Sequence, residues 1–171
     1  MDFFEVLNTR HSIRAYQPTP LEPEKLEQIL QAINRAPSAG NRQAYEVYLV
    51  QDASRQAALV QAAGGQDFLA QVPVVLVFCT HPALNRERYG ERGENLYALQ
   101  DATIACTFAM LAATALGLSS VWVGAFDEGK VHEIIGSPEG LRPVAMLPIG
   151  YASGEPRLRD RRPLNEIIHR I

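Results

Sequence analysis

Arginine side chains gather in two polar segments, one near each end of the sequence. The first segment combines cationic and hydroxyl groups within a short stretch: Arg10, His11, Ser12 and Arg14. The second follows Gly154 and is richer in arginine: Arg157, Arg159, Arg161 and Arg162. Guanidinium groups make charge-assisted hydrogen bonds to phosphate oxygens, each worth about 1.5–3 kcal/mol. The two segments are therefore suited to bind a phosphate group, although arginines that only solvate loops or pair with the surplus acids would give the same composition.

Other familiar catalytic patterns are missing from the sequence. There is no Gly-x-Gly-x-x-Gly between a strand and a helix, no phosphate-binding P-loop and no Gly-x-Ser-x-Gly nucleophile motif. Cys79 and Cys106 lie in apolar stretches without CxxC spacing, so we expect two buried, reduced thiols. The histidines are scattered and form no ligand pair at helical spacing, which argues against a metal site: His11, His81, His132 and His169.

The composition predicts a single globular domain over residues 1–171. The chain is 47% hydrophobic and 20% charged, which suffices for a substantial core. A net charge of −3 and a pI near 5.8 give no basic excess, so we expect neither nucleic acid nor a membrane as a partner. The first residues carry acidic side chains and lack the pattern of a secretory signal, which predicts a cytoplasmic location.

Two helices are expected around the first arginine segment. Asp2 is suited to cap a short helix that ends at Asn8. The clearest amphipathic helix begins at Pro23, repeats apolar residues at helical spacing and stops before Pro37. Residues 9–19 lack such periodicity, so we expect them to form a loop that carries the arginine segment.

The rest of the chain alternates between strands and helices, which predicts an α/β or α+β layered fold with one principal sheet. Residues 36–43 have the composition of a turn. Residues 81–95 lack apolar periodicity, so we expect a mobile, partly helical segment at the surface. This segment is either a lid or a solvated connector. Residues 102–118 are expected to form a helix that is apolar on all sides and therefore buried. The other expected helices are residues 53–63 and 128–135, and the expected strands are residues 45–50, 74–79, 119–126 and 143–151.

Four motifs in order resemble those of the nitroreductase family. Residues 10–16 (RHSIRAY) resemble the family's N-terminal flavin-binding motif, and residues 36–43 (APSAGNRQ) are similar to its Ala-Pro-Ser-x-x-Asn-x-Gln segment. Residues 117–124 (GLSSVWVG) resemble its Gly-Leu-Gly-x-x-Trp-Ile-Gly segment. Residues 147–151 (LPIGY), followed by residues 161–169 (RRPLNEIIH), complete the family order. The resemblance covers nearly the whole chain.

The resemblance implies an α+β fold with a central mixed or antiparallel sheet flanked by helices, a homodimer, and FMN held at the shared interface. By this likeness, Arg10 and Arg161, helped by Arg159, hold the FMN phosphate. His11, Ser12 and Arg14 belong to the same flavin-binding motif. Of these, Ser12 and Arg14 reach the ribityl chain or the pyrimidine edge of the ring. The matching positions that contact the flavin of the other subunit are Ser38, Asn41 and Gln43. The backbone of Val123 and Gly124 matches a segment that lies beside the flavin N5.

The resemblance also implies the reaction. NADH or NADPH delivers hydride to FMN and leaves, and a small oxidised acceptor such as a nitro-aromatic compound or a quinone then takes its place in a ping-pong cycle. No catalytic side chain is expected, because the cofactor carries the chemistry. Three alternatives stay open. They are another flavin reaction of the same fold, such as dehalogenation, dehydrogenation of peptide azoles or flavin breakdown; a non-catalytic flavin-binding protein; and an α/β domain that binds some other phosphate.

The sequence departs from the family pattern at three places. Ala44 and Tyr45 replace the usual Pro-Trp, and Gly65 and Gln66 stand where some relatives carry Asn and Lys near the ring. The sequence given ends at Ile171, without the longer arm that some members wrap around their partner. The departures leave substrate choice open, and dimer stability is expected to depend mainly on packed helices. The best candidate for that packing is residues 102–117, although an ordinary core helix would have the same composition.

Overall fold

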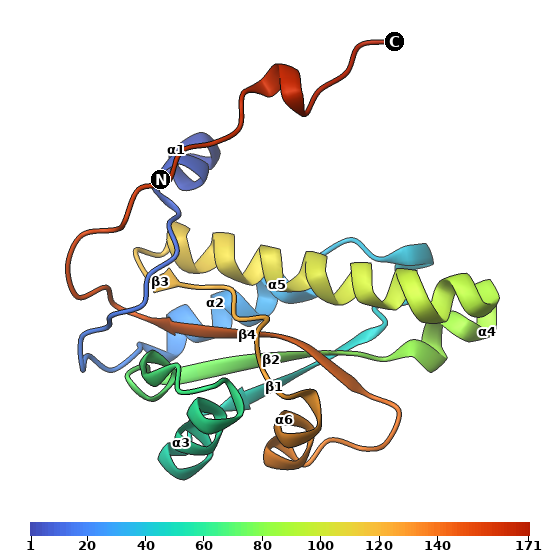
Figure 1. Ribbon diagram of the computed structural model, residues 1–171, viewed down its shortest axis with the longest axis horizontal. Helices are drawn as coiled ribbons and strands as arrows, with labels where there is room; N and C mark the ends of the chain where they lie inside the picture. The colour runs from blue at the N-terminus through green and yellow to red at the C-terminus, as the bar shows by residue number, and fades with distance from the viewer.

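The computed structural model describes residues 1–171 and contains one four-stranded antiparallel sheet (Figure 1). The strands are β1 (Tyr45–Val50), β2 (Val74–Thr80), β3 (Ser119–Ser120) and β4 (Arg142–Gly150), in the spatial order β1-β2-β4-β3. All three strand pairs are antiparallel. The expected α+β class is confirmed. Of the two expected sheet types, mixed and antiparallel, the structure has the antiparallel sheet.

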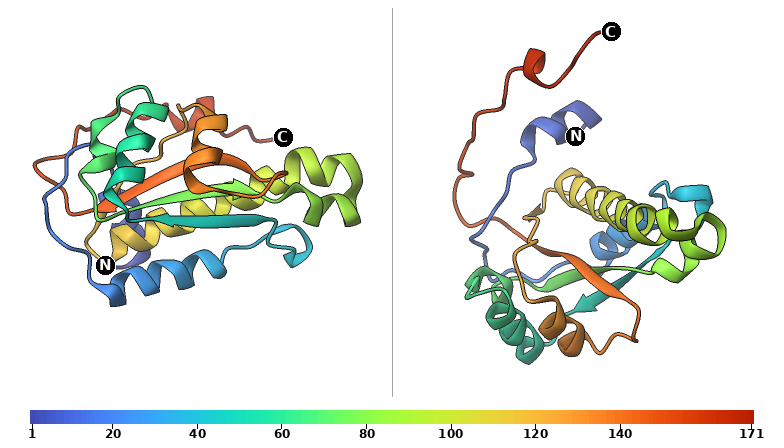
Figure 2. Two further views of the ribbon diagram at one scale, coloured as in Figure 1. Left: turned by 90° about the horizontal axis from the view of Figure 1, so that it is seen from below. Right: turned by 45° about the vertical axis from the view of Figure 1, so that its right-hand side comes forward.

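Six α-helices surround this sheet (Figures 1 and 2). They are α1 (Phe3–Thr9), α2 (Pro23–Asn34), α3 (Ala53–Ala62), α4 (Pro82–Arg92), α5 (Ala98–Ala115) and α6 (Glu128–Ile135). Helices α2 and α5 pack together on one face of the sheet, and α3 and α6 pack together on the other face. The helices predicted from capping and periodicity at the N-terminus are confirmed, and Asp2 forms the expected cap of α1 together with Glu5.

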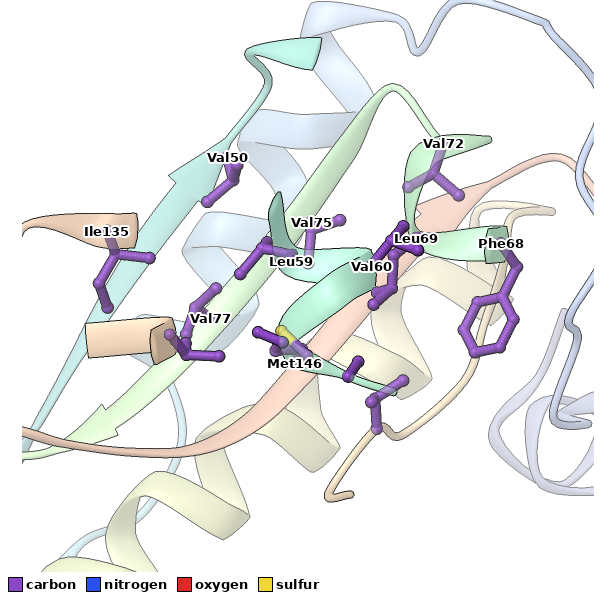
Figure 3. Close-up of a cluster of buried hydrophobic side chains, with 14 of the residues drawn as sticks. Val50, Leu59, Val60, Phe68, Leu69, Val72, Val75, Val77, Ile135 and Met146 are labelled. Atoms are coloured by element: carbon purple, nitrogen blue, oxygen red, sulfur yellow. The ribbon is translucent and has the colours of Figure 1, made fainter. Parts of the chain in front are cut away.

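Strand β2 is the centre of the core. Every residue of β2 is buried, and its side chains alternate between the two faces as the strand repeat requires. Val75 and Val77 join the cluster beneath α3 and α6, which Figure 3 shows together with Leu59 and Met146. Leu76 and its neighbours on the other face join the cluster beneath α2 and α5. The continuous apolar run in the sequence therefore reflects a strand covered on both faces.

One expected strand is wrong in length, and one expected surface segment is helical over most of its length. Residues 119–126 were expected to form a strand, but only Ser119 and Ser120 pair with β4, and Val123 forms a single further bridge with Met146. Residues 81–95 were expected to be partly helical, and they contain α4, whose backbone is interrupted at Gly90, followed by a π-helical turn, Gly93–Tyr97, that joins it to α5. The helix forms without apolar periodicity because its contacts are largely polar, as described below.

The combined stretch Pro82–Ala115 is long and apolar enough, by length and composition alone, to cross a membrane. Helix α5 nevertheless packs against β2 and β4, as the core helix of a layered domain does. The expectation that residues 102–118 form a helix buried on all sides is wrong for a single chain, because Phe108 and Leu111 are only partly buried. Helix α5 therefore carries apolar side chains that its own sheet does not cover.

Candidate functional site

The first arginine segment runs along the β3 edge of the sheet. The Ile13 N–H donates to the Ser120 carbonyl at 3.1 Å, and the Ser153 N–H donates to the Ala15 carbonyl at 2.9 Å. Tyr16 anchors the segment: its ring is buried, and its hydroxyl donates to the Ile13 carbonyl at 2.8 Å. Burial raises the pKa of Tyr16, so the hydroxyl stays protonated as a donor. The aromatic position of the RHSIRAY motif thus has a structural function.

The polar side chains of this segment point away from the core and are available to a ligand. Arg10 and His11 are half-buried, while Ser12 and Arg14 are exposed. None of the ion pairs of the chain uses Arg10 or Arg14. A cavity of about 190 Å³ lies beside His11, and its wall includes Gly117 and Gly154. Arg10 and Arg14 do not line this cavity themselves, but each is the direct chain neighbour of a residue that does, His11 or Ile13, so the segment is a suitable site for an anion.

The second arginine segment is only partly brought to this place. Residues 152, 154 and 156, at the start of the C-terminal tail, line the cavity next to His11. Arg159 and Arg161 lie further along, in a fully exposed extended stretch that leads away from the sheet (Figure 1). In the tail, Arg162 pairs instead with Glu166. The single chain therefore holds Arg10 near the cavity but does not hold Arg159 and Arg161 there.

Val123 and Gly124 differ in what their backbones offer. The Val123 N–H and carbonyl are both used, at 2.9 Å each, in hydrogen bonds with Met146. Gly124 is exposed and its backbone groups make no hydrogen bond to another backbone group. A Cβ at Gly124 would lie 3.3 Å from the Trp122 indole nitrogen, which is close. Of the two, Gly124 is the residue whose backbone is open to a ligand.

The other predicted contacts lie in a tight loop at residues 38–43. Gly40, Asn41 and Gln43 all have left-handed backbones, with φ of 54°, 56° and 48°. This conformation is costly for residues with a side chain and persists only where the surroundings enforce it. The Gln43 N–H donates to the Ser38 hydroxyl oxygen at 2.9 Å, and the Gln43 side chain donates to Asn34 at 3.1 Å.

A buried carboxylate that the sequence analysis did not select holds this loop. Asp101, at the start of α5, is 2% exposed. It accepts the Ala39 N–H at 2.8 Å, the Ala44 N–H at 3.4 Å and the Asn85 side-chain amide at 2.9 Å. The only signal for Asp101 in the sequence is its position directly before the alanine-rich stretch that was expected to form a buried helix. A charged side chain is rarely buried there without a partner.

Helix α4 packs against the same loop rather than standing alone in solvent. Arg42 forms an ion pair with Glu87, and its Nε donates to the Leu84 carbonyl at 3.0 Å. The Tyr89 hydroxyl lies so close to Gly40 that a Cβ there would clash with it. Tyr97 and Ser38 both line an open cavity of about 670 Å³. Residues 81–95 are therefore attached to this loop rather than fully surrounded by solvent.

The two groups of site residues lie at opposite ends of α5. The loop at residues 38–43 is bonded to Asp101 in the first turn of this helix, whereas the Ser12 segment pairs with Ser120, just beyond its end. A helix of 18 residues is about 27 Å long at 1.5 Å per residue. Figures 1 and 2 show the N-terminal segment and the loop on opposite sides of the molecule. Within one chain, the two groups do not meet.

Apolar side chains remain uncovered on the α5 side of the molecule. Phe3 and Phe4 of α1 are 61% and 73% exposed. An open cavity of about 460 Å³ beside them has only apolar walls, including Phe108 and Leu111 of α5. The tail adds further exposed residues: Leu158, Leu164, Ile167, Ile168 and Ile171. An apolar surface of this kind is typical of a face that another protein surface covers.

Comparison with known proteins agrees with this architecture. The family model described as "Nitroreductase family" matches residues 7–151. The "FMN reductase [NAD(P)H]" of Bacillus subtilis is 31% identical, with 95% of this chain and 71% of that protein aligned. The "Putative NADH dehydrogenase/NAD(P)H nitroreductase" of Archaeoglobus fulgidus is 30% identical, with 88% of this chain and 86% of that protein aligned. The solved structure of a nitroreductase family protein from Clostridium difficile is 33% identical, covers 99% of this chain and 98% of its own, and has a TM-score of 0.87.

The layered α+β fold matches that of a nitroreductase family protein, and the similarity to an FMN reductase places the protein among the oxidoreductases of this fold. The chain belongs to the nitroreductase family. The family resemblance predicted from the four motifs is thereby confirmed.

Proposed function

We propose that residues 1–171 act as one FMN-binding domain of a cytoplasmic homodimeric enzyme. In this proposal, NADH or NADPH would be the electron donor, FMN the redox cofactor, and a small oxidised compound such as a nitro-aromatic compound or a quinone the acceptor in the same pocket. The names of the two relatives described above, an FMN reductase and a putative nitroreductase, support this choice of cofactor and donor. The single observation that carries the proposal is the separation of the two groups of site residues by the length of α5.

The unpaired polar groups of the chain fit FMN. Arg10 and Arg14 have no carboxylate partner, and Ser120 beside them has a buried hydroxyl without any partner. Arg10 would bind the phosphate, with Arg159 and Arg161 added when the tail folds over the site. Ser12 and Arg14 would bind the ribityl chain and the pyrimidine edge, and His11 would form the wall of the phosphate cavity. These assignments use cations for the anionic end and hydroxyl groups for the neutral part of the cofactor.

A second copy of the chain would supply the remaining contacts. Ser38 accepts one hydrogen bond within its loop, so its hydroxyl proton is free to donate to a ligand. Asn41 is exposed, and its side chain makes no hydrogen bond within the loop. Gln43 donates its side-chain amide to Asn34 and retains its amide oxygen as an acceptor. The apolar face formed by α1, α5 and the tail is the surface through which two copies would bring these groups together.

The bound FMN supplies the hydride-accepting and hydride-donating atom of the reaction. Among residues of this chain, Gly124 presents an open backbone N–H, while Val123 fixes that backbone through its two bonds to Met146. The Arg14 cation would stabilise negative charge at the pyrimidine edge. No side chain is assigned as an acid or a base, because solvent can supply the protons.

The first test is the visible spectrum of the purified protein, with anaerobic addition of NADH and then NADPH to the FMN-loaded form. Bleaching of the flavin band is the expected result and identifies the donor. A flavin that binds but stays oxidised would indicate a binding protein, and the absence of FMN affinity would contradict the proposal entirely. Arg10→Ala should weaken FMN binding about tenfold or more, because it removes a charge-assisted contact worth about 1.5–3 kcal/mol. The matched control is Arg55→Ala, which removes an exposed, unpaired arginine from α3 on the other face of the sheet.

A further inference from the structure

We propose that Asp101 is a positioning residue that shapes the loop at residues 38–44 for FMN contact by Ser38 and Asn41. This inference rests on the proposed function. Asp101 does not reach the cofactor itself, because its carboxylate is 2% exposed and faces the inside of the loop. Its effect on FMN is therefore transmitted through the backbone that it binds.

The contacts of Asp101 account for its burial without a cation. Its Oδ1 accepts the Ala39 N–H, and its Oδ2 accepts the Ala44 N–H and the Asn85 side-chain amide. No arginine or lysine forms an ion pair with it. A buried carboxylate is tolerated when several N–H donors satisfy it, and here two of the three donors belong to the backbone at the two ends of one loop.

The loop needs such a clamp because its own conformation is unfavourable. Asn41 and Gln43 are the only two residues with side chains that have positive φ in this chain, and Gly40 beside them is also left-handed. Backbone strain of this kind concentrates at functional sites and is maintained by surrounding contacts. Because Asp101 binds the residues immediately before and after this strained stretch, it fixes the direction in which Ser38 and Asn41 project.

The same carboxylate joins the loop to α4. Asn85 is fully buried and turns its amide nitrogen to Asp101, while its side-chain oxygen has no partner. The carboxylate can only accept a hydrogen bond, so the Asn85 side chain must present its nitrogen to Asp101 and leave its oxygen without a donor. The carboxylate therefore determines the orientation of Asn85. Helix α4 and the loop are thereby held in one arrangement, which also places Tyr89 against Gly40.

The test compares Asp101→Ala and Asp101→Asn with two matched controls. Asp52→Ala and Asp127→Ala each remove a carboxylate that accepts a backbone N–H, from Arg55 and Lys130, at the N-termini of α3 and α6 on the far face of the sheet. For every variant, FMN affinity is measured by fluorescence quenching, stability by urea unfolding, and the environment of the bound ring by visible circular dichroism.

We expect Asp101→Ala to raise the FMN Kd at least tenfold and to change the visible circular dichroism of the bound flavin. The loss in Asp101→Asn is smaller, about threefold to tenfold, because one side-chain oxygen remains and Asn85 is able to turn its free oxygen toward the new amide. The two controls should keep the wild-type Kd within about twofold even where their urea midpoints fall. Loss of affinity without a matching loss of stability separates positioning from a general structural role.

The isosteric Asp101→Asn variant keeps the proposal testable if Asp101→Ala does not fold. Asp101→Asn replaces one of the two carboxylate oxygens by an amide nitrogen, so amide hydrogen exchange should increase at whichever of Ala39 and Ala44 loses its acceptor. Wild-type FMN affinity in a variant with this faster exchange would overturn the inference and leave the proposed function intact. Failure of the wild-type protein to bind FMN would overturn both.

Discussion

A mixed dimer of two different variants tests whether the site is divided between two chains. Arg10→Ala damages the segment beyond the end of α5, and Asn41→Gly damages the loop at its start. Glycine is chosen at position 41 because it retains the left-handed backbone, with φ of 56°, while removing the side chain. Because the two positions are separated by about the 27 Å length of an 18-residue helix, one site within one chain cannot contain both.

The expected result follows from symmetry. In a dimer of one Arg10→Ala chain and one Asn41→Gly chain, the two lesions fall in the same shared site and the other site is intact. Arg10→Ala alone should lower affinity about tenfold to a hundredfold, from a lost contact of about 1.5–3 kcal/mol. At an FMN concentration just above the wild-type Kd, the mixed dimer should therefore carry about half the flavin of the wild-type dimer, while the Arg10→Ala homodimer carries little.

The assay uses chains with two different affinity tags, co-expressed and purified through both tags, so that only mixed dimers remain. Flavin absorbance per dimer is then titrated with FMN. A biphasic titration, with one site of wild-type affinity, supports the divided site. Two weakened sites, with none of wild-type affinity, would refute the reasoning, because that result requires Arg10 and Asn41 of one chain to serve the same flavin.

Three further predictions concern the interface, the acid stability and the core. Phe108→Arg places a charge on the apolar face of α5 and should shift the protein toward monomer, with loss of bound flavin, as measured by sedimentation velocity. A variant that remains a stable, flavin-loaded dimer would contradict the proposed interface. Hydrogen bonds to the Glu22 carboxylate, first from the Tyr151 hydroxyl and then from its own backbone and Lys25, lower the pKa of Glu22 from 4.5 to about 2, so this stabilisation is present above pH 4.5 and is lost as the pH falls toward 2. The difference in free energy of unfolding between wild type and Tyr151→Phe should therefore shrink over that range, and a difference independent of pH would exclude this cause. Leu76→Ala, at a fully buried position of β2, should reduce the free energy of unfolding by about 2–5 kcal/mol in urea titrations. A loss below about 1 kcal/mol would mean that neighbouring core side chains move in to fill the cavity.

Much of the sheet and the N-terminal helices could be predicted because their signals are local. Asp2 and Glu5 form a capping box that can be recognised in the sequence, and the α2 periodicity is that of a helix with one buried side. Strand β2 could be recognised because burial on both faces leaves a continuous apolar run. In these elements, the pattern of residue types directly reflects which face is covered.

The remaining elements depend on partners that sequence periodicity does not encode. Helix α4 is held by Arg42, Glu87 and Asn85 through polar contacts across the chain, so its sequence reads as a solvated segment. Residues 121–126 have the composition of a buried strand, but beyond Ser120 only Val123 finds a partner on β4. The tertiary position of β4 therefore decides where pairing ends.

The role of Asp101 could not be predicted from its neighbours for the same reason. Its partners Ala39 and Ala44 lie 62 and 57 residues away, and neither has a side chain that would draw attention to a hydrogen bond. The motif at residues 36–43 predicts which side chains contact a ligand, but it does not show that their backbone is bonded to α5. The sequence motif therefore proposes the contacts, and the structure locates the residue that holds the loop.

Helix α5 connects the proposed site to the proposed dimer. Its length separates the two groups of site residues, and its outer face carries the apolar side chains that a second copy would cover. Composition alone reports that the helix is apolar all round, but it does not distinguish a core helix from one shared between two chains. If the same helix both divides the site and forms the interface, FMN binding and dimerisation are linked, and each must strengthen the other by the same factor. The FMN affinity of this protein should therefore fall on dilution below the dimer dissociation constant, as it would not for a site contained within one chain.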